Sequence, residues 1–199
     1  MISYLPQYLD ALNGELKLRL EQLPEIDNVH TLYFGGGTPS LLKPDQFARI
    51  FKTIRENVNL SPRVEISLEA NPETVSQQLI QELHEIGFTR ISMGMQSAAP
   101  QDLKVLDRRH SLESVMSAVA WSHRAGFEHI NLDLIFGIPG QTLESWLETL
   151  KIALSTQVDH YSIYGLALEE GTRLKKWVDR GQVSRPDDDL AADMYEAAT

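Results

Sequence analysis

The sequence contains no cysteine among its 199 residues. This absence excludes a disulfide framework, a zinc site built from thiolates, a cysteine nucleophile, and an iron–sulfur cluster ligated by this chain itself. Basic residues are also in short supply, because 18 Lys and Arg stand against 28 Asp and Glu, which gives a formal charge of −10. A chain with this charge repels polyphosphates and anionic lipids, so we do not expect sequence-independent binding of nucleic acid.

Long hydrophobic runs are missing as well. No uncharged apolar stretch approaches about 18 residues, the length that suggests a membrane-spanning helix, and residues 1–6 lack the basic and apolar regions of a signal peptide. We therefore expect a cytoplasmic protein without a membrane span. The 42% of apolar and 23% of charged residues are typical of a soluble domain and predict one domain over residues 1–199, folded around a single core.

Short apolar runs alternate with longer stretches of helical periodicity along the chain. The expected strands cover residues 29–34, 64–69, 90–96, 129–136 and 160–166. The expected helices cover residues 5–23, 44–58, 76–86, 111–125 and 142–155. The acidic run at 187–189 fits the first turn of a closing helix, where the helix dipole favours carboxylates. Because strands and helices alternate, the pattern predicts an α/β fold with a parallel sheet covered by helices.

Three consecutive expected strands each carry one apolar row and one polar row of side chains. Successive residues of a strand point to opposite faces, which puts Glu69, Gln96 and Asp133 in the polar rows. A second helix layer could not cover these rows without unpaired carboxylates and amides, at a cost on the order of 1–3 kcal/mol each. The polar rows must therefore line a cavity, which favours a curved, barrel-like sheet over a doubly wound one. Five strands are too few for a closed (β/α)8 barrel, so we expect an incomplete barrel or a piece of a longer one.

Candidate site residues gather at the C-terminal ends of these strands, where barrel enzymes place their active sites. The turn at residues 35–37 is all glycine, so its backbone amides and the Thr38 hydroxyl can approach a ligand closely; a turn that only redirects the chain is the alternative. Glu69 either binds a ligand or accepts hydrogen bonds from the following loop. A carboxylate inside an apolar strand is costly unless paired, so we expect Asp133 to contact a ligand or to pair with Arg108, which could instead be a cation at a helix C-terminus. The six histidines show no metal-ligand spacing.

Four motifs together resemble a known family. They are Tyr-Phe-Gly-Gly-Gly-Thr-Pro-Ser at 33–40, Glu-Ala-Asn-Pro at 69–72, Ser-Met-Gly-Met-Gln-Ser at 92–97, and Asp-Leu-Ile-Phe-Gly-Ile-Pro-Gly-Gln-Thr at 133–142. In this order they resemble the radical S-adenosylmethionine (SAM) proteins of the oxygen-independent coproporphyrinogen III oxidase family, in particular its heme chaperone (HemW-like) branch. The resemblance implies a partial (β/α)6 TIM-like barrel, with SAM lying across the C-terminal ends of the strands.

The resemblance also implies cofactor contacts for individual residues. By matching position these are Gly36, Gly37, Thr38, Glu69, Gln96, Arg108, Asp133 and Ala167. The glycines and Thr38 would meet the methionine end of SAM, Glu69 would hold its amino group, and Ala167 would contact the adenine side. A sulfonium cation that also carries an ammonium group suits a cavity rich in carboxylates.

One part of the family pattern has no counterpart in this sequence. Family members carry a Cys-x-x-x-Cys-x-x-Cys loop after their first strand, which holds the [4Fe–4S] cluster that reduces SAM. Here the chain opens at what resembles the following helix, so we expect a core domain that lacks the first strand and is truncated at both ends, with residues 186–199 leading toward an absent C-terminal domain. Without cluster ligands, we expect no radical chemistry from the isolated chain and a lowered affinity for SAM. The strand at 29–34 should be an unpaired sheet edge.

Two functions remain open on this resemblance, besides a barrel fragment with no retained activity. One is a SAM-binding heme chaperone that delivers heme to client hemoproteins, and the other is an oxidoreductase of porphyrin biosynthesis, a coproporphyrinogen oxidase (dehydrogenase). The segments 137–142 and 161–172 look more like the chaperone branch, which favours the first. Heme or porphyrin is then the expected partner. No histidine is singled out as a heme ligand, and the oligomeric state stays open.

Overall fold

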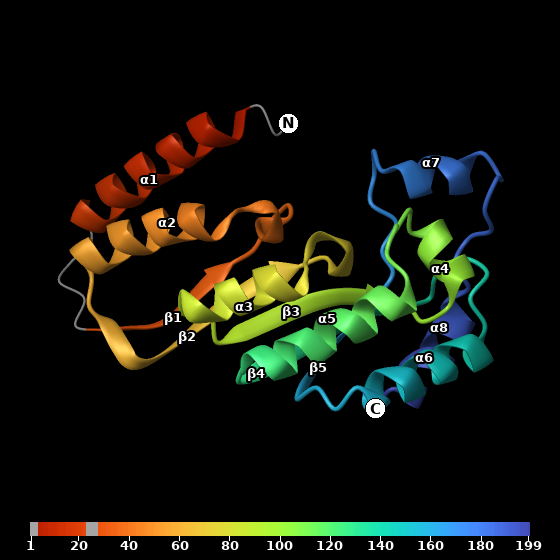
Figure 1. Ribbon diagram of the computed structural model, residues 1–199. Coiled ribbons are helices and arrows are strands. Elements are labelled where there is room, and N and C mark those ends of the chain that lie inside the picture. The colour runs from red at the N-terminus through yellow and green to blue at the C-terminus, as the bar shows by residue number, and fades with distance from the viewer. Residues whose placement is uncertain (1–3, 23–27) are drawn as a thin grey trace.

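The computed structural model describes residues 4–22 and 28–199. Helices and strands alternate through most of this part of the chain (Figure 1). In order they are α1 (Leu5–Gln22), β1 (Val29–Phe34), η2 (Pro39–Leu41), α2 (Pro44–Asn57), β2 (Leu60–Ala70), η3 (Pro72–Thr74), α3 (Gln77–Glu85), β3 (Arg90–Gln96), α4 (Pro100–Val105), α5 (Leu112–Ala125), β4 (His129–Phe136), α6 (Leu143–Ser155), β5 (His160–Gly165), α7 (Arg173–Asp179) and α8 (Asp188–Ala197), where η marks a 3-10 helix.

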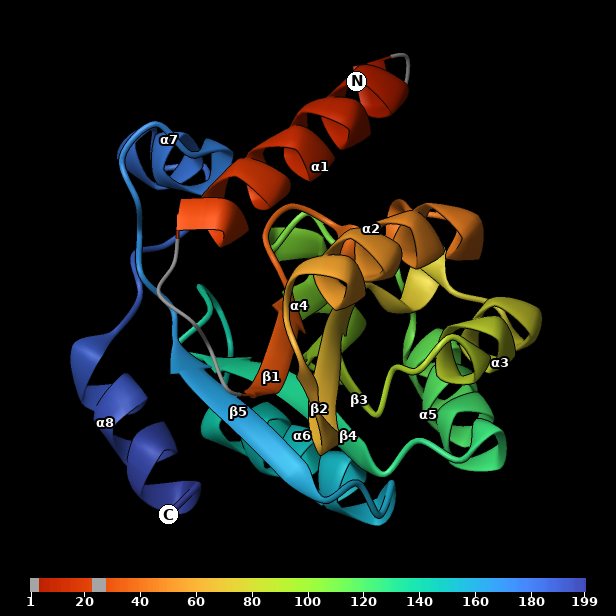
Figure 2. The same ribbon diagram turned by 90° about the vertical axis from the view of Figure 1, so that its left-hand side faces the viewer.

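In the described part of the chain, five strands form one parallel sheet in the order β1-β2-β3-β4-β5. Each strand is added on the same side of its predecessor, without the reversal of strand order that defines a doubly wound sheet. Figure 2 shows the strands following a curve, with α2, α3, α5 and α6 on its outer side. The sheet is thus a curled half-barrel, which confirms both the curved, incomplete barrel expected from the polar rows and the partial TIM-like barrel that the family resemblance implies.

The hydrophobic core lies between the outer face of the sheet and the helices. Leu68, Met93 and Leu132, from three neighbouring strands, are fully buried there. Beside them, four phenylalanines form a cluster with ring centroids 5.0–5.4 Å apart, mostly edge to face. The rings come from β1, from α2 and from the segment between α3 and β3: Phe34, Phe47, Phe51 and Phe88. The apolar rows are therefore on the outside of the curve, which leaves the polar rows on its inside.

Helix α8 closes one end of this core. Met194 is fully buried, and its carbonyl oxygen accepts a hydrogen bond of 2.8 Å from Nε1 of the buried Trp146 in α6. Asp187 caps the N-terminus of α8, since its carboxylate accepts from the backbone N–H of Leu190 at 3.0 Å. This confirms the reading of the acidic run as the start of a closing helix. The expected role of residues 186–199 as a connection to a further domain stays a prediction.

Some element boundaries differ from the expectation. Strand β2 begins at Leu60 rather than at residue 64, because the shift in register between Val29 and Thr31 of β1 accommodates the segment around Pro62. Strand β5 ends at Gly165, and the short helices α4 and α7 were not predicted. Pro24, expected to end the first helix, lies outside the described residues.

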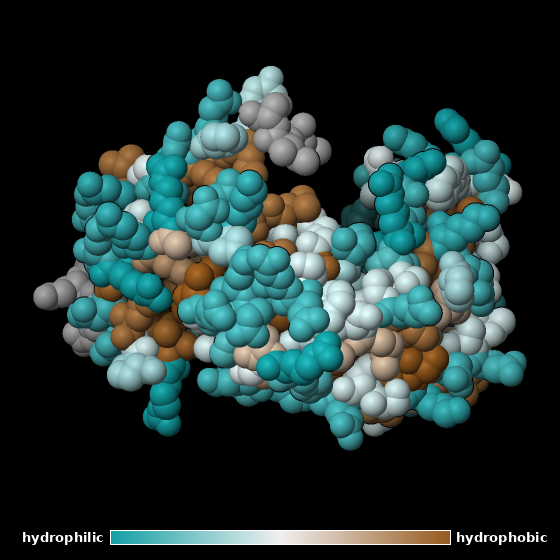
Figure 3. Space-filling model, viewed as in Figure 1, coloured by the Kyte–Doolittle hydropathy of each residue, from teal (hydrophilic) through white to brown (hydrophobic). Residues whose placement is uncertain are grey.

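Among the described residues, β1 pairs with β2 alone and so forms one edge of the sheet, as expected. Its exposed side chains include Tyr33, at 66% exposure. Figure 3 shows a largely hydrophilic face with smaller hydrophobic areas, and a hollow between the part of the molecule that bears α1 and the part that bears α7. In the part of the chain described, no helix combines the length and the apolar character needed to cross a membrane.

Candidate cofactor-binding site

A cleft of about 270 Å³ opens on the inside of the half-barrel, at the C-terminal ends of the strands. Its lining consists of Gly36, Gly37, Thr38, Pro39, Glu69, Ala70, Asn71, Ser92, Gly94, Gln96, Arg108 and Asp133. Seven of the eight residues singled out in the sequence are among them. The eighth, Ala167, is exposed in the segment after β5 and does not line the cleft. Two larger hollows lie on the outer surfaces of α1 and α6, each lined by that one helix, and bring no such groups together.

The carboxylate of Glu69 is held from two sides at the mouth of the cleft. Its Oε1 accepts a hydrogen bond of 2.5 Å from the Tyr33 hydroxyl, and its Oε2 accepts one of 3.1 Å from the backbone N–H of Gly36. Partial burial and the neighbouring Glu69 raise the pKa of Tyr33 above its ordinary value, so the phenol remains a donor. A Cβ at Gly35 would lie 2.5 Å from Tyr33 Cε1 and 3.0 Å from Glu69 Oε1, so glycine is required for this arrangement.

The glycine turn forms one wall of the cleft from backbone alone. Gly36 has φ 116°, a conformation that side chains of L-residues rarely adopt. A Cβ added at Gly36 or Gly37 would meet no atom within 4 Å. The turn therefore leaves open space beside Glu69, in addition to redirecting the chain.

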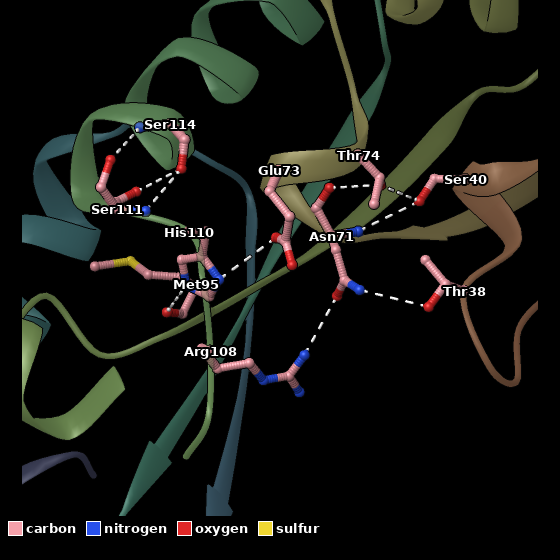
Figure 4. Close-up of polar contacts among 10 residues, drawn as sticks. All are labelled: Thr38, Ser40, Asn71, Glu73, Thr74, Met95, Arg108, His110, Ser111 and Ser114. Carbon is pink, nitrogen blue, oxygen red and sulfur yellow. Dashed lines mark hydrogen bonds and ion pairs between the residues drawn. The ribbon is translucent and has the colours of Figure 1, made fainter. Parts of the chain in front are cut away.

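Gln96 ends β3 in an unusual backbone conformation. Its φ is 64°, which is uncommon for a residue other than glycine and costs on the order of 1–3 kcal/mol. Its side chain is buried and folds back over the strand, since its Nε2 lies 2.5 Å from where a Cβ on Gly94 would be. The carbonyl of Met95 bonds to Nε2 of the buried His110 at 3.0 Å, which fixes the end of the strand (Figure 4). Gly94 therefore makes room for Gln96 to reach the cleft.

Asp133 faces the same cleft from β4. Its Oδ1 accepts a hydrogen bond of 2.7 Å from Asn131 Nδ2, and the Ser92 hydroxyl lies 3.3 Å from both of its oxygens. Burial raises the pKa of Asp133 above its ordinary value, the charge of Glu69 adds to this, and the hydrogen bonds oppose it. Within the described residues no ion pair joins Asp133 to Arg108, so the pairing offered as an alternative is wrong.

Arg108 is instead held by Asn71, a residue that the sequence analysis did not single out. Nη1 of Arg108 donates to Asn71 Oδ1 at 3.4 Å, and Asn71 Nδ2 donates to the Thr38 hydroxyl at 3.5 Å (Figure 4). The backbone N–H of Asn71 donates to Ser40 Oγ at 3.4 Å. Asn71 therefore joins the glycine turn to Arg108. Its place directly after the end of β2 was a usable signal, because the C-terminal ends of parallel strands meet at one edge.

The cleft is acidic, with one cation at its side. Glu69 and Asp133 both reach it, and the charge of Glu69 makes ionisation of Asp133 less favourable. A bound cation would relieve this repulsion, and Arg108 could meet an anionic group of the same ligand. The arrangement can thus bind a small molecule that carries positive charge beside polar groups.

Three comparisons with known proteins bear on this site. The family model of the radical SAM superfamily matches residues 11–153. The chain is 42% identical over 190 residues to the heme chaperone HemW of Mycobacterium tuberculosis, covering 96% of this chain and 48% of that protein. It is 37% identical over 189 residues to the heme chaperone HemW of Lactococcus lactis, covering 95% and 48%. Coproporphyrinogen III oxidase (HemN) from Escherichia coli, a radical SAM enzyme, superposes with a TM-score of 0.86 at 30% identity, covering 96% of this chain and 44% of that one. The chain spans about half the length of the curated relatives it matches.

Proposed function

The chain belongs to the radical SAM superfamily, and we propose that its cleft binds S-adenosylmethionine as part of a heme chaperone that delivers heme to hemoproteins. The observation that carries the proposal is the convergence of Glu69, Asp133 and the bare backbone of Gly36 and Gly37 on one cleft. SAM carries an ammonium and a sulfonium, and two carboxylates beside open backbone suit such a ligand. Residues 1–199 would act as one core domain.

The cleft fits SAM better than it fits an iron–sulfur cluster. Its volume of about 270 Å³ lies just below the range of about 300–1,000 Å³ usual for small-molecule sites, as suits a half-barrel that covers a ligand from one side. Glu69 would hold the ammonium group, and the glycine turn would lie along the methionine part. Superfamily membership also implies a [4Fe–4S] cluster, whose irons take cysteine thiolates. This chain has no cysteine, so its own residues do not fit the cluster and we derive no chemical step from it.

Heme is the proposed cargo because of the relatives. The heme chaperones HemW match nearly the whole chain at up to 42% identity. The structural similarity to coproporphyrinogen III oxidase supports the alternative, in which the partner is a porphyrinogen and the protein an oxidoreductase. Heme and porphyrinogen share the tetrapyrrole ring, so the two functions are separated by what is done with the ring.

Titrations of the purified chain test both parts of the proposal. We expect calorimetry to detect SAM binding with a Kd weaker than about 1 µM, which corresponds to less than about 8.2 kcal/mol, because the contacts of a cluster are missing. Absence of binding at millimolar SAM would overturn the SAM proposal, and submicromolar binding would show that a cluster contributes little. In a separate titration, a Soret shift with heme and no binding of a porphyrinogen favours the chaperone. Binding of a porphyrinogen without a heme-induced Soret shift favours the oxidase.

The affinity for SAM is expected to fall as the pH is lowered. The pKa of Asp133 is raised above its ordinary value, so this carboxyl takes up a proton at a higher pH than an exposed aspartate does. Protonation removes a negative charge from the cleft and weakens binding of a cation. In Asp133→Asn we expect weaker binding at neutral pH and a flatter profile on the acidic side of neutrality. Calorimetry at each pH measures both, and an unchanged profile in the variant would assign the dependence to another group.

A further inference from the structure

A chain of hydrogen bonds crosses the inner face of the half-barrel from β5 to Asp133. Nδ1 of His160, at the exposed start of β5, lies 2.6 Å from Oδ1 of Asn131. On the other side of the amide, Nδ2 of Asn131 donates to Asp133 Oδ1 at 2.7 Å and to the Ser92 hydroxyl at 2.7 Å. Ser162 completes the set by donating to Asn131 Oδ1 at 3.2 Å. The buried amide of Asn131 thus uses both N–H bonds and both lone pairs.

The carboxylate decides which way this amide points. An ionised carboxylate only accepts hydrogen bonds, so the NH2 group of Asn131 must face Asp133. The amide oxygen then faces His160, and because an oxygen cannot donate, the proton between them must sit on His160 Nδ1. A neutral imidazole carries one proton, which leaves Nε2 of His160 without one.

We propose that His160 is a positioning residue for Asp133, acting through Asn131: the Nδ1–H of His160 fixes the amide, and the amide orients the carboxylate toward the cleft. Nδ1 donates in the neutral imidazole and in the protonated one, so this positioning does not depend on the charge of the ring. His160 and Asn131 hold Asp133 in this orientation before any ligand binds. Only its effect on SAM affinity rests on the proposed function.

Other ionisable groups face Asp133 from the neighbouring elements. Glu69 of β2 and Tyr33 of β1 lie on the same face, and their mutual hydrogen bond is described above. Tyr164 of β5 faces this side too, and Arg108 lines the cleft. Besides burial, the charge of Glu69 raises the pKa of Asp133. The hydrogen bond from Asn131 lowers it. Loss of the bond from Asn131 should therefore shift the titration of Asp133 upward.

The charged side chains toward the N-terminal ends of the strands are paired with one another. On the same face, Glu65 forms an ion pair of 3.0 Å with Arg90, and His129 Nδ1 lies 2.7 Å from Asp159 Oδ2. None of these contacts involves Asn131. His129 is therefore a matched control for His160: a histidine at the N-terminal end of the neighbouring strand, bonded through the same ring nitrogen to another residue.

The first test needs no variant. In the unaltered chain at a pH where His160 is neutral, side-chain ¹⁵N NMR should show the proton on Nδ1. A neutral ring protonated on Nε2 would overturn the proposal. The tautomer does not depend on SAM, so this outcome is independent of the proposed function.

The second test compares three variants through the ¹³C shift of the Asp133 carboxyl carbon as a function of pH. In His160→Ala we expect the titration midpoint to rise by about half a pH unit or more, because the hydrogen bond from Asn131 that favours the ionised carboxylate is weakened. His160→Asn places an N–H where Nδ1 was and should restore the midpoint, whereas His129→Ala should leave it unchanged. An unchanged midpoint in His160→Ala, or no recovery in His160→Asn, would contradict the positioning role.

SAM binding supplies a third readout. At pH 7 we expect His160→Ala to lower the affinity about 3- to 10-fold, and His160→Asn to recover most of it. If the NMR midpoints shift as described while no variant and no unaltered chain binds SAM, the positioning stands and the proposed ligand is wrong. If SAM binds and the midpoints do not move, the proposed ligand stands and the positioning is wrong.

Discussion

Replacing Glu69 with glutamine is expected to lower the affinity for SAM about 10- to 100-fold. Glutamine keeps the size of the side chain and one acceptor oxygen for Tyr33 or Gly36, but it removes the charge that would meet the ammonium group. A hydrogen bond to a charged group contributes about 1.5–3 kcal/mol, and each 1.4 kcal/mol corresponds to about a factor of ten in Kd. Isothermal titration calorimetry of the two proteins measures the difference directly.

Two further variants make the result specific. Glu65→Gln removes a carboxylate from the same strand and the same face, but near the N-terminal ends of the strands, where it pairs with Arg90 at 3.0 Å. We expect no change in SAM affinity there. Tyr33→Phe leaves the Glu69 charge in place and removes only one of its two hydrogen bonds, so its effect should stay within a few-fold. Equal binding by Glu69→Gln and the unaltered chain would remove Glu69 from the site.

The alternation of side chains along single strands was enough to predict the inner face of the half-barrel. Period-2 alternation is a local property, so Glu69, Gln96 and Asp133 could be assigned to one face without knowing the pairing of the strands. Parallel pairing then brings their C-terminal ends together, and the cleft contains all three. The curvature of the sheet could be predicted as well, because a flat sheet covered by a second helix layer would bury these groups without partners.

Partners across the cleft could not be predicted in the same way. Arg108 follows the six-residue helix α4, which is too short for its periodicity to stand out. The contact between Arg108 and Asn71 depends on the direction in which this helix leads the chain, so it could not be predicted. The positive φ of Gln96 was equally hidden, since glutamine gives no local signal for it. The sequence likewise gave no reason to bury His110, whose side chain is 1% exposed with Nδ1 3.6 Å from Glu73. Each of these depends on contacts between segments distant in sequence.

Asp102 is the most consequential residue that the sequence analysis passed over. This carboxylate is 1% exposed, in the first turn of α4, and accepts hydrogen bonds from the Ser97 hydroxyl at 2.7 Å and from Gln141 Nε2 at 3.0 Å. Gln141 also accepts from the backbone N–H of Ile138 at 3.2 Å, which closes the loop after β4. The Thr149 hydroxyl of α6 accepts from the backbone N–H of Ala98 at 3.1 Å. Asp102 therefore ties the end of β3 to the loop after β4.

Asp102→Ala is expected to destabilise the fold by about 2–5 kcal/mol. The substitution leaves two buried donors without their acceptor, and a buried group left unpaired costs about 1–3 kcal/mol, more where a charged partner is lost. In a domain of this size, about 1 kcal/mol shifts the melting temperature by roughly 2–4 °C, so a fall on the order of 10 °C is expected. Thermal and urea unfolding followed by circular dichroism measure the loss.

Asp107→Asn is the matched control, five residues further along, because asparagine removes the charge and tolerates the φ of 55° at this position as aspartate does. Its carboxylate is 65% exposed and pairs with Arg173 at 2.9 Å on the surface, an interaction that contributes about 0–1 kcal/mol. Its melting temperature should therefore stay within a few degrees of the unaltered chain. Equal losses in the two variants would mean that burial of the Asp102 network contributes nothing beyond an ordinary surface pair. A loss confined to Asp102→Ala would show that the loops around the cleft are held by this carboxylate, since it joins the segment after Gln96 to the segment after Asp133.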